Sequence, residues 1–261
     1  MFRIRQIVSI AALAVVPLAL HAASLEPFHA TCRIRAGEKA GKLRLEMEYG
    51  DCQDHKHCGT NDNDIAATRF TGVSVASLAQ SGSQLAASLT AEAGTFTCTG
   101  TVVASELAGN AVFTPNPTFV STMEKMGFTG YDSDKLMTYA ILDVESGWAR
   151  SLKDLGIHGI DTDNLIALRI FNIDPEYVHS MTALGYALPD ADQLISMRVQ
   201  GVNADEVGQI RALGYQPTLD QLVQIRIFKV TPDFIRRMQA RGFKNLSIDK
   251  LVQIRIFNLA D

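Results

Sequence analysis

Leu222-Val-Gln-Ile-Arg-Ile-Phe228 recurs without a change at Leu251-Val-Gln-Ile-Arg-Ile-Phe257, and a close variant, Leu165-Ile-Ala-Leu-Arg-Ile-Phe171, lies upstream. Near-identical copies at a fixed spacing are the sequence signature of a repeat protein. Each copy is preceded by a glycine, and successive glycines are separated by 29, 29, 29 and 28 residues: Gly127, Gly156, Gly185, Gly214 and Gly242. We therefore expect five units of about 29 residues within residues 116–261.

Each unit contains the start and stop signals of two short helices. Residues whose side chains suit an N-cap precede most of the expected first helices, at Asn116, Glu145, Asp174, Asn203 and Thr231. Similar residues precede the second helices, at Asp132, Asp161, Asp190, Thr218 and Ser247. The repeated glycine suits the left-handed residue that ends a helix. One such α-hairpin has too little core to be stable alone, so the units are expected to stack into a curved solenoid.

An arginine occupies the same place in the second helices of units two to five, whereas unit one has Ala140: the four are Arg169, Arg198, Arg226 and Arg255. One interpretation is a cationic stripe that binds an acidic partner or an anionic glycan. The other is a structural ladder, in which the stems cover apolar surface and the guanidinium groups pair with nearby acids. The acids expected in this role are Asp163, Asp192, Asp220 and Asp249. We favour the ladder, because a residue that recurs in every copy of a repeat is expected to make the contacts between neighbouring units.

Unit four departs from the pattern at the start of its first helix. Glu206 stands where the other units have an aromatic residue: Phe119, Trp148, Tyr177 and Phe234. This difference suggests a looser joint or a binding spot.

The N-terminal third alternates apolar and polar residues at period two, which is typical of half-buried strands. In residues 42–49, for example, Leu43, Leu45 and Met47 share one face. The alternating stretches are residues 31–35, 42–49, 84–91, 95–103 and 109–114. We therefore predict an α+β fold: a small antiparallel β domain, residues 24–115, followed by the α-hairpin repeat solenoid, residues 116–261.

The first residues have the pattern of a secretory signal peptide, expected to span residues 1–23. Arg3 and Arg5 precede an almost wholly apolar run, residues 7–20, and small residues follow it. That run is shorter than the roughly 20 residues of a spanning helix, although a retained anchor is the alternative. We expect a periplasmic or secreted chain without a transmembrane segment in its mature form. The net charge of −4 disfavours nucleic acid as a partner.

All four cysteines lie in the first 100 residues. An even number in an oxidising compartment favours two disulfides, for which three pairings are possible. We favour Cys52–Cys58, closing a short polar loop, and Cys32–Cys98, joining two strands.

The polar loop between Cys52 and Cys58 also holds two histidines that could bind zinc or copper, His55 and His57. The C-x5-C spacing matches no common zinc module, however, and the thiols are expected to be oxidised. A disulfide-bonded loop without a metal is therefore favoured, and no cofactor is expected.

No catalytic motif was found: the chain lacks H-E-x-x-H, a P-loop, G-x-S-x-G and G-x-G-x-x-G. Ser247-Ile248-Asp249-Lys250 matches S-x-x-K. Ser247, however, is the repeat equivalent of four helix caps that are not serines, so this match is interpreted as a cap.

Several segments resemble the short helical repeats appended to bacterial beta-lactam-sensing antirepressor-type membrane metallopeptidases and to related exported proteins of unknown function. The matching segments are Thr231-Pro-Asp-Phe-Ile235, Ala212-Leu-Gly-Tyr215, the repeated heptapeptide, and Ala93-Gly-Thr-Phe96 with Phe113-Thr-Pro115. The resemblance covers residues 84–261. It implies a fold and an envelope setting, but no activity, because the peptidase zinc motif and membrane helices are absent from this sequence.

These patterns together favour a non-enzymatic interaction or envelope-sensing module that acts through its helical surface. The partner is expected to be an envelope protein or an anionic envelope component, and both stress sensing and toxin neutralisation fit. The alternatives are a metal or redox role of the Cys52–Cys58 loop, an enzyme whose residues are dispersed, and a purely structural envelope protein.

Overall fold

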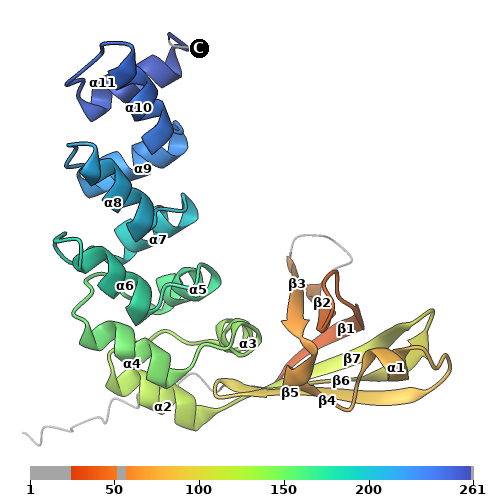
Figure 1. Cartoon of the computed structure of the whole chain (residues 1–261). Coiled ribbons are helices and arrows are strands. Elements are labelled where there is room, and N and C mark those ends of the chain that lie inside the picture. Colours follow the sequence, from red (N-terminus) through yellow and green to blue (C-terminus); the bar gives the residue numbers. More distant parts are fainter. Residues whose placement is uncertain (1–24, 52–56, 260–261) are drawn as a thin grey trace, which may run out of the picture.

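The structure, a computed structural model, describes residues 25–51 and 57–259 and has the predicted α+β class (Figure 1). An antiparallel seven-stranded sheet comes first, with the strand order β3-β2-β1-β7-β6-β5-β4. Its strands are β1 (Phe28–Ala36), β2 (Lys42–Asp51), β3 (His57–Ala66), β4 (Phe70–Thr71), β5 (Gln84–Ala91), β6 (Gly94–Val103) and β7 (Glu106–Pro115). A 3-10 turn, η1 (Ala67–Arg69), and a short helix, α1 (Val75–Leu78), connect β3, β4 and β5.

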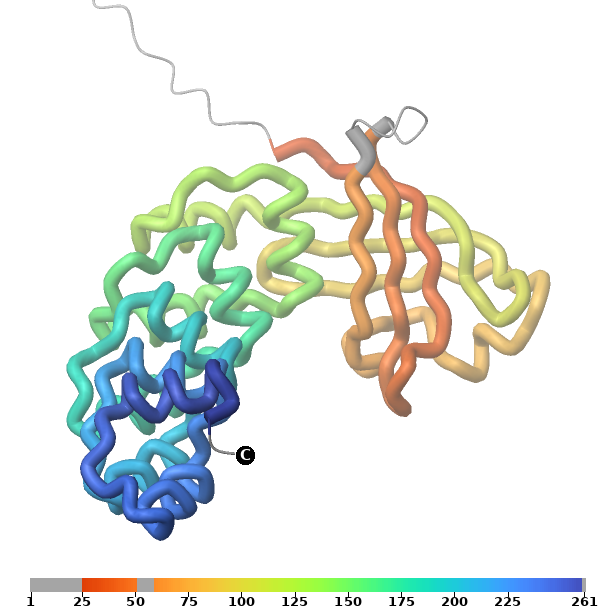
Figure 2. The backbone as a smooth tube through the Cα atoms, turned by 90° about the horizontal axis from the view of Figure 1, so that it is seen from above, coloured from red at the N-terminus to blue at the C-terminus, as the bar shows by residue number. Residues whose placement is uncertain are grey.

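The sheet is strongly curled, so that β1, β2 and β3 cross the direction of the other strands (Figures 1 and 2). Gly109 of β7 pairs with Gly100 of β6, and a Cβ on Gly109 would lie 2.0 Å from the carbonyl oxygen of Thr99. Glycine is therefore required where these strands approach closely. The curl brings the Cα atoms of Cys32 and Cys98 to 6.1 Å, and their disulfide joins β1 to β6 across β7. The expected Cys32–Cys98 pairing is confirmed.

Strand β3 corrects the sequence analysis, which included no strand between residues 49 and 84 and placed a polar loop between Cys52 and Cys58. The strand was missed because asparagines and aspartates dominate it, and Ile65 is its only large apolar residue among the side chains described. Pairing with β2 stabilises it, helped by an ion pair between Arg44 and Asp62. Three earlier predictions lie outside the described residues: the signal peptide, the Cys52–Cys58 disulfide and the metal site at His55 and His57, where for His57 and Cys58 only the backbone is described.

Helices follow the sheet in ten segments, here called the helical array: α2 (Pro117–Lys125), α3 (Ser133–Leu142), α4 (Ser146–Asp154), α5 (Thr162–Ile170), α6 (Pro175–Thr182), α7 (Ala191–Val199), α8 (Ala204–Ala212), α9 (Leu219–Ile227), α10 (Pro232–Ala240) and α11 (Ile248–Ile256). All begin at the predicted N-cap positions. The five repeated glycines have φ between +78° and +93°, which confirms the expected left-handed residue. No helix in the described part of the chain has the length and apolarity needed to cross a bilayer.

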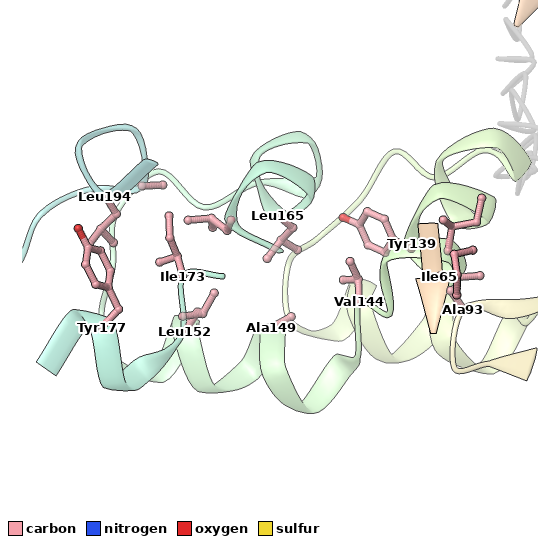
Figure 3. Packing of buried hydrophobic residues seen from close by; sticks show 14 of the residues in the cluster. Ile65, Ala93, Tyr139, Val144, Ala149, Leu152, Leu165, Ile173, Tyr177 and Leu194 are labelled. Carbon is pink, nitrogen blue, oxygen red and sulfur yellow. The ribbon is translucent and has the colours of Figure 1, made fainter. Parts of the chain in front are cut away.

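One hydrophobic core runs from the sheet through the helical array. Each second helix contacts the next along α3, α5, α7, α9 and α11, and among the first helices α2 contacts α4 and α8 contacts α10. Figure 3 shows Tyr139, Leu165 and Leu194 of the second helices facing Ala149, Leu152 and Tyr177 of the first helices. Each hairpin therefore buries its apolar side chains partly against the neighbouring hairpins.

The sheet packs on the first hairpin, where α3 contacts β5, β6 and β7. It also supplies a helix cap. Glu145 makes no side-chain cap for α4, and the carboxylate of Glu92 instead accepts a 2.7 Å hydrogen bond from the backbone N–H of Ser146. A carboxylate at this end also suits the helix dipole. The β domain therefore covers and caps the start of the helical array.

Candidate interaction surface on the second helices

The four repeated arginines are engaged inside the helical array. Each is half-buried and reaches the C-terminal end of the preceding second helix, where backbone carbonyls have no partner within the helix. The Nε–H of Arg198 donates to the carbonyl of Phe171 at 3.0 Å. The equivalent bonds run from Arg169 to Leu142, from Arg226 to Gln200 and from Arg255 to Lys229, at 3.0–3.2 Å. The arginines therefore cap helices across unit boundaries.

Three of these four guanidinium groups also lie over aromatic rings of the first helices. Arg198 lies 4.6 Å from the ring centroid of Tyr177, a distance suited to a cation–π contact. Arg169 over Trp148 and Arg255 over Phe234 repeat the arrangement at 5.5 and 4.8 Å. This is the structural role that the sequence analysis favoured.

The acidic partners proposed for that ladder were wrong. The ion pairs of these arginines in the described residues involve Asp143, with Arg169, and Glu206, with Arg226. The four aspartates begin the second helices, whereas the guanidinium groups lie at the opposite helix ends. Asp163 pairs with Lys135 instead. Spacing alone did not reveal this separation along the helix axis.

The C-terminal end of α3, which Arg169 caps from unit two, receives a further cation from the β domain. Arg69 of η1 donates to the carbonyls of Ile141 and Ala140 at 2.6 and 2.7 Å, and its Nη2 is 2.9 Å from Asp143. The β domain thus docks on α3 with the same kind of contact that joins successive units. Sequence reasoning missed Arg69, because nothing in the repeat pattern points to a residue outside the helices.

The residue that follows each repeated arginine is exposed and aliphatic. Ile170, Val199, Ile227 and Ile256 have exposed fractions of 48–51%. The core positions of α5 are Leu165 and Leu168, and the helical period turns Ile170 away from them. Because successive second helices are in contact, these four side chains form a line across the units, here called the aliphatic row.

The equivalent residue in unit one, Ile141, is only 4% exposed. The sheet packs against its helix there, so the β domain already occupies the first position of the row. Sequence reasoning missed the row, because an aliphatic residue in an amphipathic helix is normally expected in the core.

A cleft of about 510 Å³ lies where the sheet meets the start of the aliphatic row. Strand β3 is the nearest of the first three strands to the helices in both views (Figures 1 and 2). The cleft lies within the size range of protein binding sites. Its lining residues are Lys42, Asn63, Asp64, Ile65, Ala66, Arg69, Ile141, Leu142, Arg169, Ile170 and Asn172.

The large pKa shifts in the described residues belong to tyrosines and have structural causes. Two main causes raise the pKa of Tyr49 on β2 to about 12: the larger is burial, and the smaller is a hydrogen bond with Asp134 of α3. Burial also raises the pKa of Tyr139, whose hydroxyl donates to the carbonyl of Thr162 at 2.7 Å. Both hydroxyls hold elements together. Among the described residues, no group of three or more His, Cys, Asp or Glu is placed to hold a metal ion.

The chain was compared with protein-family models, with curated proteins and with solved structures, and none of them matches it. The antirepressor-type resemblance therefore stays a prediction.

Proposed function

We propose that this protein is an exported, non-enzymatic interaction module that binds an envelope protein through the second-helix face of its helical array. The observation that carries the proposal is the aliphatic row. Four equivalent residues in contacting helices each leave about half of their surface exposed. Aligned apolar surface of this kind on a soluble protein is typical of a binding site.

In this proposal, residues 116–261 act as a five-unit solenoid. Repeated N-caps, repeated left-handed glycines and caps that cross unit boundaries support that description. A solenoid presents one extended surface along its length, which suits recognition of another protein.

The repeated arginines have a secondary role in the proposed interface. Their Nε atoms are already bonded to helix carbonyls, and the side chains are half-buried. The part that stays accessible lies beside the aliphatic row and forms a cationic rim. Apolar contacts at the centre with charged contacts around them are the usual composition of a protein interface. An acidic rim on the partner suits this arrangement.

An oxidising envelope compartment is part of the proposal. The expected signal peptide and the Cys32–Cys98 disulfide support it, because structural disulfides persist in such compartments. Within the envelope, the module would report on its partner by binding it, as a sensor or as an antagonist.

Site-specific photo-crosslinking in cells tests the proposal. A photoreactive residue is placed at Ile170, Val199 or Ile227, with His179 on α6 and Gln209 on α8 as exposed control positions on the first helices. We expect the three positions of the row to label one common partner that the controls do not label. Equal labelling from both sets of positions, or no labelling from the row, would overturn the proposal.

A further inference from the structure

Residues 60–66 of strand β3 have an edge that pairs with no other strand among the described residues. In the sheet order β3 is terminal, and in the described part of the chain its ladder runs only to β2. The other side of the strand therefore presents backbone N–H and C=O groups that are able to pair with another strand.

This edge faces the helices rather than open solvent. Residues 63–66 of β3 line one wall of the cleft, and Ile141 and Ile170 of the second helices line another. Figures 1 and 2 both place β3 as the strand of its group nearest to the helical array. A chain in the cleft would thus have backbone partners on one side and the start of the aliphatic row on the other.

The geometry points to recognition by strand addition: an extended segment of the partner protein pairs with the free edge of β3 inside the cleft. Backbone hydrogen bonds to β3 supply affinity, and side chains that contact Ile170 supply specificity. This inference rests on the proposed function and deepens it. The surface is continuous with an interface that the molecule already has, because the sheet buries Ile141 at the head of the same row.

The two faces of β3 define the chemistry of the segment. Ile65 is buried on the core side, whereas Asp62 and Asp64 are exposed on the opposite side. Residues opposite one another in neighbouring strands share a face. A fitting segment therefore has an aliphatic residue on the face of Ile65, uncharged residues beside Asn61 and Asn63 on that same face, and basic residues on the face of the aspartates.

Asp64 is the acidic residue among those that line the cleft, and two of the cations there, Arg69 and Arg169, are already paired with Asp143. Asp62 is paired with Arg44, but Asp64 has no ion pair in the described part of the chain. A lysine or arginine opposite Asp64 gains a cross-strand charge pair, and an acidic residue there is repelled. The two aspartates also disfavour a second copy of β3 at this edge, which would bring acidic residues together.

Fluorescence anisotropy with synthetic peptides and the full chain tests the inference. The probe is a short labelled peptide that alternates valine and lysine, and the matched control replaces lysine with glutamate. Two further probes carry N-methyl groups on alternate residues, in one register or the other. Only one edge of a peptide can pair with β3. We therefore expect one methylated register to bind at least about tenfold more weakly, while the other binds like the parent.

A charge exchange on the protein identifies the site. The Asp64→Lys substitution is expected to lower the affinity for the lysine peptide about fivefold and to raise the affinity for the glutamate peptide. Hydrogen exchange at residues 63–66 should slow when the lysine peptide is added. Equal effects of both methylation registers, or protection confined to α5 and α7, would overturn strand addition. So would a dimer that dissociates in the Asp64→Lys variant, because that result assigns the edge to a second copy.

The two proposals fail in distinguishable ways. If no peptide binds but Ile170 and Val199 still photo-crosslink one partner, strand addition is wrong and the interaction module stands. If photoreactive residues in the aliphatic row label no partner, the proposed function is wrong, and strand addition, which rests on it, is wrong as well.

Discussion

Arg226 of α9 forms an ion pair with Glu206 of α8, in the place where three equivalent arginines lie over an aromatic ring. The departure in unit four is thus matched by a change of interaction, from cation–π stacking to a salt bridge. The Nε atom of Arg226 keeps its bond to the carbonyl of Gln200 at 3.0 Å. The structure therefore gives Glu206 a partner within the helical array.

This pairing predicts how substitutions at Glu206 behave. Glu206→Ala should lower the free energy of unfolding by about 1 kcal/mol, because it leaves a half-buried guanidinium without its acid. Glu206→Tyr should recover most of that loss by restoring the stacking seen at Tyr177. Urea unfolding measures both variants. A tyrosine variant less stable than the alanine variant would contradict the equivalence of the two arrangements.

Arg198 should contribute more stability than a surface arginine does. Arg198→Ala removes a helix cap and a cation–π contact together, and we expect a loss of about 2 kcal/mol in unfolding free energy. Arg198→Lys should lose less, because lysine keeps the charge but not the planar group that stacks on Tyr177. The matched control is Arg236, which is exposed and paired with Asp233. Its alanine variant should lose at most about 0.5 kcal/mol of unfolding free energy. Equal effects at the two sites would contradict the capping role.

The helices were predictable from the sequence because their boundaries depend on local chemistry. A cap such as Asp161 acts on residues two and three positions away, and Gly156 acts on its own backbone. What sequence reasoning missed depends on distant neighbours. Arg69 meets α3 across more than 70 residues, and β3 forms because β2 lies beside it rather than through its own apolar pattern.

The exposure of the aliphatic row could not be predicted from the sequence either, because it also depends on distant neighbours. A repeat identifies which residues are equivalent, but Ile141 and Ile170 occupy equivalent positions with very different exposure. Only the placement of the sheet separates them.

The contact between Arg69 and α3 should hold the β domain against the helical array. Arg69→Ala leaves two carbonyls and Asp143 without this donor, and we expect a loss of roughly 2–3 kcal/mol in unfolding free energy. Hydrogen exchange should quicken at the end of α3 and change little in α9. Asp143→Asn is the companion variant, and it should lose less because the carbonyl contacts remain. Unchanged exchange in α3 would show that apolar packing alone holds the junction.

Alkaline pH should destabilise the fold through its tyrosines. The pKa of Tyr49 rises from 10.0 to about 12 on folding, and burial raises the pKa of Tyr139 as well. The unfolded chain then loses protons that the folded chain keeps, so this stabilisation is complete below pH 10 and is lost as the pH rises toward 12. Urea unfolding across that range, beside an absorbance titration of the phenolates, measures the effect. Tyr49→Phe should flatten the decline; an unchanged slope would exclude Tyr49 as a contributor.

Removing the Cys32–Cys98 disulfide should destabilise the sheet more than the helices. The bond links residues 66 apart, and closing a loop of that length corresponds to about 4 kcal/mol of unfolding free energy. It also joins two strands that both pair with β7, which holds the curl that brings β3 toward the helices. A Cys32→Ala and Cys98→Ala double variant should therefore exchange faster in β1 and β6 than in α9. It should also bind the valine–lysine peptide more weakly, because the cleft depends on the curl. Faster exchange together with unchanged peptide binding would show that the cleft forms without this bond.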